Sequence, residues 1–147
     1  MILIPLVASP LVYLSGRLGT HETTLHRRSY LVRGLALLAI LLAWIPFVLS
    51  MQTFLAGETQ EFNIEAIWLR VDGISLLAAA MILTLGTLVI LFSGPYMAGE
   101  VGEEKYYAML LAMIGLMIGL ACSGDLFNLW IWFEGMAISS YLLVAFY

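Results

Sequence analysis

Long apolar stretches alternate with short polar segments along the whole chain. We expect each stretch to form a membrane-spanning helix, because roughly 20 apolar residues in a helix cross the hydrocarbon layer of a bilayer. The expected spans are about residues 2–16, 30–55, 74–97, 106–122 and 126–147. The pattern therefore predicts an all-α, polytopic membrane protein with about five transmembrane helices, in which residues 1–147 form a single membrane domain.

The segment between the second and third stretches has a different period. From Glu61 to Ile67, polar and apolar residues alternate roughly by twos. Such alternation is typical of a strand with one face toward water. We therefore expect a short β-hairpin that lies over the membrane surface.

Composition strengthens the membrane assignment. Hydrophobic residues make up 63% of the chain and charged residues 11%, and the mean hydropathy is +1.01. A soluble domain is nearer half apolar and a quarter charged, so a soluble fold is excluded. No basic tail suggests nucleic-acid binding. The single cysteine, Cys122, excludes an internal disulfide and a multi-cysteine metal site.

Basic residues predict the orientation. They concentrate in and just beyond the first polar segment, residues 17–29. These residues are Arg17, Arg27, Arg28 and Arg33. Positive charge in short loops stays on the cytoplasmic side. We therefore expect the N-terminus and the hairpin outside, the Lys105 loop inside, Asp125 outside and the C-terminal end inside a cell (inner) membrane.

Glu134 is the strongest candidate for chemistry. It lies about 12 Å along the last span at a rise of about 1.5 Å per residue, close to mid-membrane. A charge at that depth costs about 2.5–3.5 kcal/mol on insertion scales. Burial favours the neutral carboxyl and a nearby cation favours the ionised one. A group balanced between these effects can exchange a proton, although a neutral glutamate that only hydrogen-bonds a neighbouring helix remains an alternative.

We expect no basic residue inside any span, since Arg70 and Lys105 lie at membrane edges. A counter-charge for Glu134 would then come from another chain or from residues beyond Tyr147.

Two aspartates are secondary candidates. Asp125 opens the last span, where a carboxylate can cap free N–H groups at a helix N-terminus; a role in proton entry is the lesser alternative. Asp72 opens the third span, either as a second cap or as the partner of Arg70 in a surface pair. No phosphate-binding loop, nucleophile triad or haem-ligand pattern is present. We therefore expect no cofactor, no metal and no redox chemistry on this chain.

Three motifs resemble a known family. Residues 124–144, GDLFNLWIWFEGMAISSYLLV, resemble the fifth helix of the antiporter-like subunits of respiratory complex I, Mrp-type cation/proton antiporters and membrane-bound hydrogenases. Residues 70–76, RVDGISL, and 104–107, EKYY, look like the family's entries to its third and fourth helices. The first 60 residues are similar only in hydropathy and in the hairpin.

The resemblance implies a role for Glu134. In that family the fifth-helix glutamate is part of the proton-translocation machinery and pairs with a lysine on a broken seventh helix. Glu134 matches the glutamate, whereas the lysine has no counterpart before Tyr147. The chain is then the N-terminal piece of a split subunit or a truncation, and we favour the split subunit.

Two functions follow. In the first, the chain is a proton- or cation-translocating membrane subunit of a complex I-like, Mrp-like or hydrogenase-like complex. Glu134 then lines an ion channel that another chain completes. That partner chain carries the remaining helices and a mid-membrane lysine. In the second, the chain is a structural membrane subunit, consistent with Gly115 and Gly119, whose spacing lets another helix approach closely. A small independent transporter is a weaker third.

Overall fold

The computed structural model of the chain describes residues 1–18, 25–64, 67–97, 100 and 102–145. The turn of the expected hairpin, part of the first polar segment and Tyr147 lie outside the described residues.

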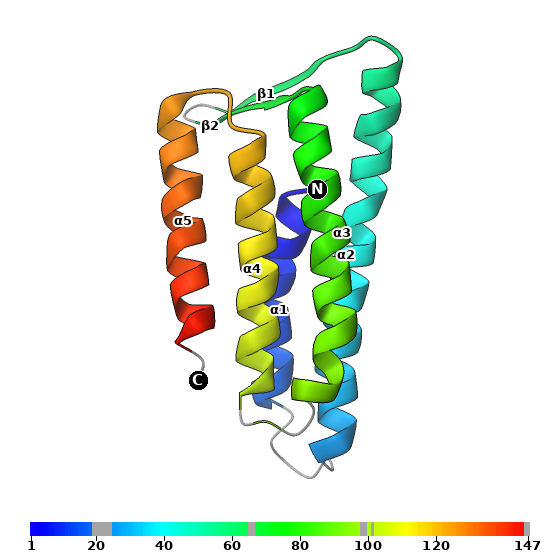
Figure 1. The fold of residues 1–147 in the computed structure, drawn as a ribbon, viewed down its shortest axis with the longest axis vertical. Coiled ribbons are helices and arrows are strands. Elements are labelled where there is room, and N and C mark those ends of the chain that lie inside the picture. Colours follow the sequence, from blue (N-terminus) through cyan, green and yellow to red (C-terminus); the bar gives the residue numbers. More distant parts are fainter. Residues whose placement is uncertain (19–24, 65–66, 98–99, 101, 146–147) are drawn as a thin grey trace.

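The described helices run antiparallel, each turning back along the one before it (Figure 1). They are α1 Leu3–Leu18, α2 Leu25–Leu55, α3 Gly73–Met97, α4 Glu103–Ala121 and α5 Leu126–Val144. In the described part of the chain, α2 to α5 are long and apolar enough to cross a membrane, and α1 is a shorter apolar helix. The prediction of an all-α, polytopic membrane protein is confirmed.

The first polar segment is shorter in the structure than in the sequence pattern. Helix α1 continues to Leu18 and α2 begins at Leu25, so Arg33 lies about two turns inside α2 and within the span that starts at Tyr30. The expectation that no basic residue lies inside a span is wrong. The expected span of residues 30–55 already contained Arg33, and the structure satisfies its guanidinium with a hydrogen bond to a carbonyl of α3.

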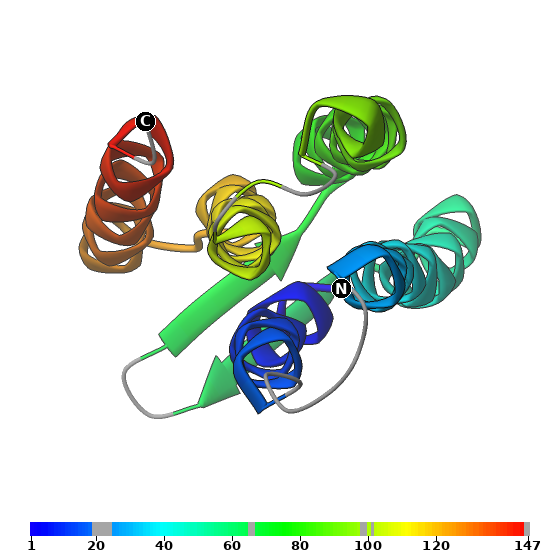
Figure 2. The same ribbon diagram turned by 90° about the horizontal axis from the view of Figure 1, so that it is seen from below.

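Helix α4 is the centre of the packing. It contacts the other four helices, and α2 least, whereas α5 lies at one edge of the bundle and packs mainly against α4 (Figure 2). Glycines allow the close approach: a Cβ at Gly86 of α3 would lie 2.6 Å from Ile114 of α4. The apolar core therefore sits among α1 to α4, and α5 is joined to it on one side.

The hairpin closes one end of the bundle. Strands β1 (Gln60–Ile64) and β2 (Ile67–Val71) pair antiparallel, with Gln60 opposite Val71 and Ile64 opposite Ile67. They cross the ends of the helices, as the view along the bundle shows (Figure 2). The predicted hairpin is confirmed, and it lies at the end of the bundle opposite the end at which α1 and α3 finish and α2 and α4 begin (Figure 1).

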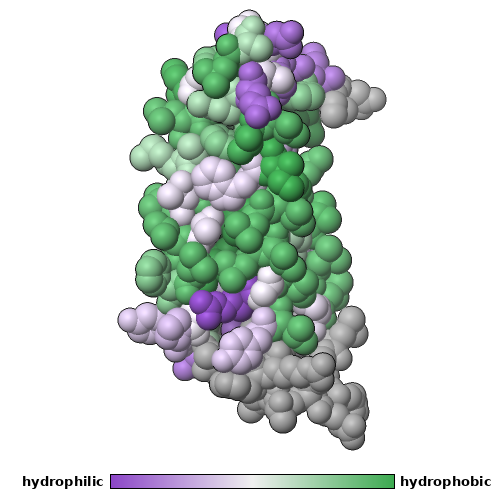
Figure 3. Space-filling model, turned by 90° about the vertical axis from the view of Figure 1, so that its right-hand side faces the viewer, coloured by the Kyte–Doolittle hydropathy of each residue, from purple (hydrophilic) through white to green (hydrophobic). Residues whose placement is uncertain are grey.

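The surface matches a membrane environment. On the face shown in Figure 3, hydrophobic side chains form a broad band, and hydrophilic side chains are concentrated toward its two ends. Large apolar side chains are exposed along the described helices, including Leu38, Ile74, Phe92 and Leu126. Lipid or another helix can cover such a surface. Exposure of so large an apolar area to water would be unfavourable.

Candidate functional site

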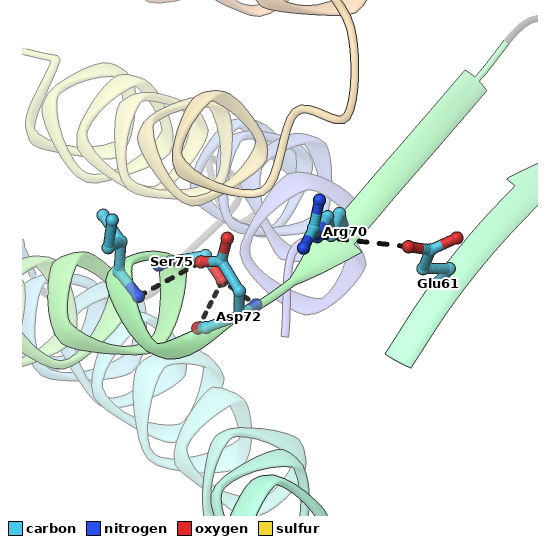
Figure 4. Close-up of polar contacts among 5 residues, drawn as sticks. Glu61, Arg70, Asp72 and Ser75 are labelled. Carbon is cyan, nitrogen blue, oxygen red and sulfur yellow. Dashed lines mark hydrogen bonds and ion pairs between the residues drawn. The ribbon is translucent and has the colours of Figure 1, made fainter. Parts of the chain in front are cut away.

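Asp72 caps the start of α3. Its Oδ1 accepts N–H bonds from Ile74 at 3.1 Å and from Ser75 at 2.9 Å, and the Asp72 N–H donates to Ser75 Oγ at 2.7 Å (Figure 4). The bond from the Ser75 N–H is the largest cause that lowers the pKa of Asp72 below its ordinary value. The capping interpretation of Asp72 is confirmed.

Arg70 has a different acidic neighbour. Its Nε lies 4.0 Å from Glu61 Oε1 on the adjacent strand, and both side chains are about half exposed (Figure 4). An exposed pair at that distance contributes little to stability. The Arg70 side chain therefore lies on the exposed surface of the hairpin, outside the membrane-spanning helices.

Strand β2 also binds the connection between α4 and α5. The Arg70 N–H donates to the Cys122 carbonyl at 2.8 Å, and the Gly124 N–H donates to the Trp68 carbonyl at 2.8 Å. A Cβ at Gly124 would lie 2.9 Å from the Trp68 ring, so a glycine is needed for this approach. The hairpin thereby fixes the point at which α5 begins.

Asp125 caps α5 directly after this connection. Its carboxylate accepts the backbone N–H of Asn128 at 2.7 Å and the side-chain amide of Asn128 at 2.6 Å. The bond from the Asn128 N–H is the largest cause that lowers the pKa of Asp125. The capping interpretation of Asp125 is confirmed, and its carboxylate is already engaged by the first turn of α5.

Cys122 is buried near Ser75, in the first turn of α3. Burial raises the pKa of its thiol to about 11, an effect that a hydrogen bond with Ser75 partly offsets. The thiol is therefore neutral at physiological pH and is a packing group, as a thiol needs its ionised form for nucleophilic chemistry.

One side of α5 faces α4. Ser139 Oγ donates to the Met109 carbonyl of α4 at 2.9 Å. Trp132 packs on Gly119, where a Cβ would lie 2.5 Å from the indole ring. A Cβ at Gly135 would lie 2.8 Å from Leu116. Trp132, Gly135 and Ser139 lie on one face of α5, the face that packs against α4. Side chains on its other faces point away from α4.

Glu134 lies outside this face of α5. Its side chain is exposed on the chain's surface, and so are Trp130, Ile138 and Tyr141, at 59%, 55% and 73%. Within α5, all of which the structure describes, only Asn128 and Ser139 are buried. The Glu134 carboxylate therefore points out of this five-helix bundle.

The three predicted carboxylates are not brought together. Asp125 lies nine positions before Glu134, about 13 Å at the helical rise, and Asp72 lies at the start of α3. The caps shape the hairpin end of the bundle, whereas Glu134 lies near the middle of α5. The residue that sequence reasoning misplaced is Arg33, because it follows a run of basic loop residues.

Comparison with known proteins finds similar membrane subunits by sequence and a similar fold among solved structures. Residues 58–107 match the family described as "NADH-Ubiquinone oxidoreductase (complex I), chain 5 N-terminus". The chain is 37% identical over 78 residues to a Na(+)/H(+) antiporter subunit of Alkalihalophilus pseudofirmus, covering 52% of this chain and 10% of that protein. It is 32% identical over 87 residues to NADH-quinone oxidoreductase subunit L of Escherichia coli, covering 59% and 14%.

A solved structure extends the likeness to the whole fold. A chain of the membrane-bound sulfane sulfur reductase, an archaeal respiratory membrane complex, superposes with a TM-score of 0.81 at 22% identity. The superposition covers 99% of this chain and 29% of the solved chain, so the five helices and hairpin correspond to less than a third of that protein. The chain is thus similar in sequence to membrane subunits of complex I and of cation/proton antiporters, and it spans only 10–14% of the length of these two relatives.

Proposed function

We propose that this chain supplies Glu134 to a proton or cation path in a multi-subunit membrane complex. The observation that carries the proposal is the position of the carboxylate. It lies at the middle of an apolar helix, and its side chain points away from the other four helices. A lipid-facing carboxylate is costly, so helices beyond these five must cover Glu134 and line the path with it.

The comparisons support a transport role. The relatives carry the names of antiporter and quinone oxidoreductase subunits, and the chain spans only a small part of each. The covering helices would lie in the remainder of such a subunit, and the family resemblance suggests that they carry a mid-membrane lysine. This polypeptide would then perform no redox step, and an ion would move past its glutamate.

Electrostatics gives the mechanism. A cation that moves to about 4–6 Å from Glu134 interacts with it by several kcal/mol at the effective dielectric of a protein. The ionised carboxylate is favoured when the cation is near, and the neutral acid when the cation withdraws. A conformational change that moves the cation would therefore make Glu134 release and rebind one proton in each cycle.

The test is Glu134→Gln in the assembled complex. We expect at least a tenfold loss of ion-driven pH change in inside-out membrane vesicles, because an amide cannot exchange the proton. The glutamine keeps the shape of the side chain, so co-purification of the other membrane subunits should be unchanged. Glu134→Asp, which keeps a carboxylate, should retain part of the transport.

Glu58→Gln is the matched control, since this carboxylate is exposed beside the hairpin. It should transport like the unmodified chain. A purely structural role for the chain makes the opposite forecast: Glu134→Gln is silent, while a bulky residue at Gly115 blocks assembly. Normal transport by Glu134→Gln would disprove the proposed path.

A further inference from the structure

Arg33 occupies an unexpected place for a charged side chain. It lies within the apolar span Tyr30–Leu55 of α2. An arginine near a membrane edge usually extends its guanidinium to the aqueous surface. Here the guanidinium turns to α3, where Nη2 donates to the Leu91 carbonyl at 2.6 Å. The Nε atom is buried from solvent and has no acceptor among the described residues.

The Leu91 carbonyl has a reason to need this donor. In an α-helix the carbonyl accepts the N–H of the residue four positions later. That residue is Pro95, which lies inside α3 and has no N–H. Helix α3 continues to Met97, so the missing bond is internal to the helix. A carbonyl without a donor is strongly unfavourable in a membrane, and a neighbouring helix commonly supplies one.

Gly94 makes room for the guanidinium. A Cβ at this position would overlap Nη1 and Cζ of Arg33. The guanidinium therefore lies directly on the backbone of α3, next to the bond that Pro95 interrupts. A flexible arginine could move away from a larger residue, but it would then lose its bond to Leu91.

The same end of α3 also contacts α4. The hydroxyl groups of Ser93 and Tyr107 lie 3.1 Å apart, within hydrogen-bond distance, and Tyr107 is fully buried. Glu103, the first residue of α4, is buried at this end as well. Arg33 thus belongs to a polar contact region shared by α2, α3 and α4.

We infer that Arg33, Gly94 and Pro95 form a clasp that locks α2 to α3 inside the membrane. Pro95 frees a carbonyl, Gly94 opens the space beside it, and the Arg33 guanidinium replaces the missing helix bond. In this clasp Arg33 joins two helices. It does not serve as one of the cytoplasmic positive charges that set the orientation of the chain. The clasp operates independently of Glu134, which lies on a different helix.

Two mutant cycles test the clasp in the full chain, purified in detergent with its membrane partners. Arg33→Met keeps an unbranched stem like that of arginine up to Nε but removes the guanidinium and its donors. We expect it to lower the melting temperature by about 5 °C. In a Pro95→Ala background the restored N–H satisfies Leu91, so Arg33→Met should lower the melting temperature by less than half as much.

The second cycle uses Gly94→Ala. This change should lower the melting temperature of the unmodified chain and have a smaller effect when residue 33 is methionine, because the guanidinium is no longer there to displace. Gly34→Ala is the control, since a Cβ there would meet nothing within 4 Å. Equal effects of Arg33→Met with proline and with alanine at position 95 would overturn the clasp.

Discussion

Carboxylates in this chain act according to what surrounds each one. Asp72 and Asp125 lie at helix starts, where backbone N–H groups hold them ionised. Glu134 lies on a face of α5 that exposes large, mainly apolar side chains. The same chemical group therefore serves as a structural cap at the end of the bundle and as the candidate ion-handling group within an apolar helix.

The Asp72 cap should be pH-dependent. Because its pKa is lowered in the folded state, the stabilisation is present above the ordinary carboxyl pKa and is lost as the pH falls through the lowered value. Asp72→Ala should cost about 1 kcal/mol of unfolding free energy at neutral pH. Melting temperatures between about pH 3 and 7 measure the effect.

Asp72→Asn separates charge from capping. Asparagine keeps an oxygen that accepts the N–H bonds of Ile74 and Ser75, so stability at neutral pH should change little. Its difference from the unmodified chain should vary with pH only in the acid range. A melting profile parallel to that of the aspartate chain at every pH would show that the carboxylate does not contribute by titration.

At the scale of elements, α5 is the helix with the smallest share of the bundle's contacts. It is anchored at its start by the hairpin through Gly124 and along one stripe by α4. Gly115 and Gly119 share the spacing of a packing motif, yet they serve two partners: Gly115 meets Leu6 of α1, and Gly119 meets Trp132 of α5. The arrangement leaves the Glu134 face free for further helices.

The α4–α5 contact should be sensitive to one methyl group. Gly119→Ala places a Cβ 2.5 Å from the Trp132 ring, and a rigid indole cannot yield without shifting α5. We expect a loss of about 1–3 kcal/mol in stability, measured by thermal unfolding in detergent.

Two comparisons make this prediction specific. Gly34→Ala should be neutral or stabilising, because its Cβ is unopposed and alanine is the better helix former. Gly119→Ala should cost less when Trp132 is alanine. If the loss is equal in both backgrounds, the indole is not what opposes the new methyl group.

For the whole molecule, the two ends of the bundle differ in charge and in structure. One end carries the hairpin and the two aspartate caps; the other carries Arg17 and Lys105. The rule that basic loops stay in the cytoplasm predicts that the hairpin end is extracytoplasmic. This prediction follows from charge, and the antiparallel helices place Arg17 and Lys105 at the same end of the bundle.

Cysteine labelling in intact cells tests this orientation. Glu58→Cys, at the hairpin end, should react with a membrane-impermeant maleimide, whereas Lys105→Cys should react only in inside-out vesicles. Cys122 should give little background, because it is buried and burial raises its thiol pKa to about 11. Labelling of Lys105→Cys alone in intact cells would reverse the assignment.

Local patterns were enough to predict the spans, the hairpin and both caps, and to single out Glu134 within an apolar helix. Each depends on neighbours in sequence: the length of an apolar run, a period of two, or a carboxylate at a helix start. The tertiary structure decided which faces meet. It placed Arg33 on the carbonyl that Pro95 frees, directed the two glycines to different helices and turned Glu134 outward. Such contacts depend on side chains from distant segments, and hydropathy along one helix does not encode its partners.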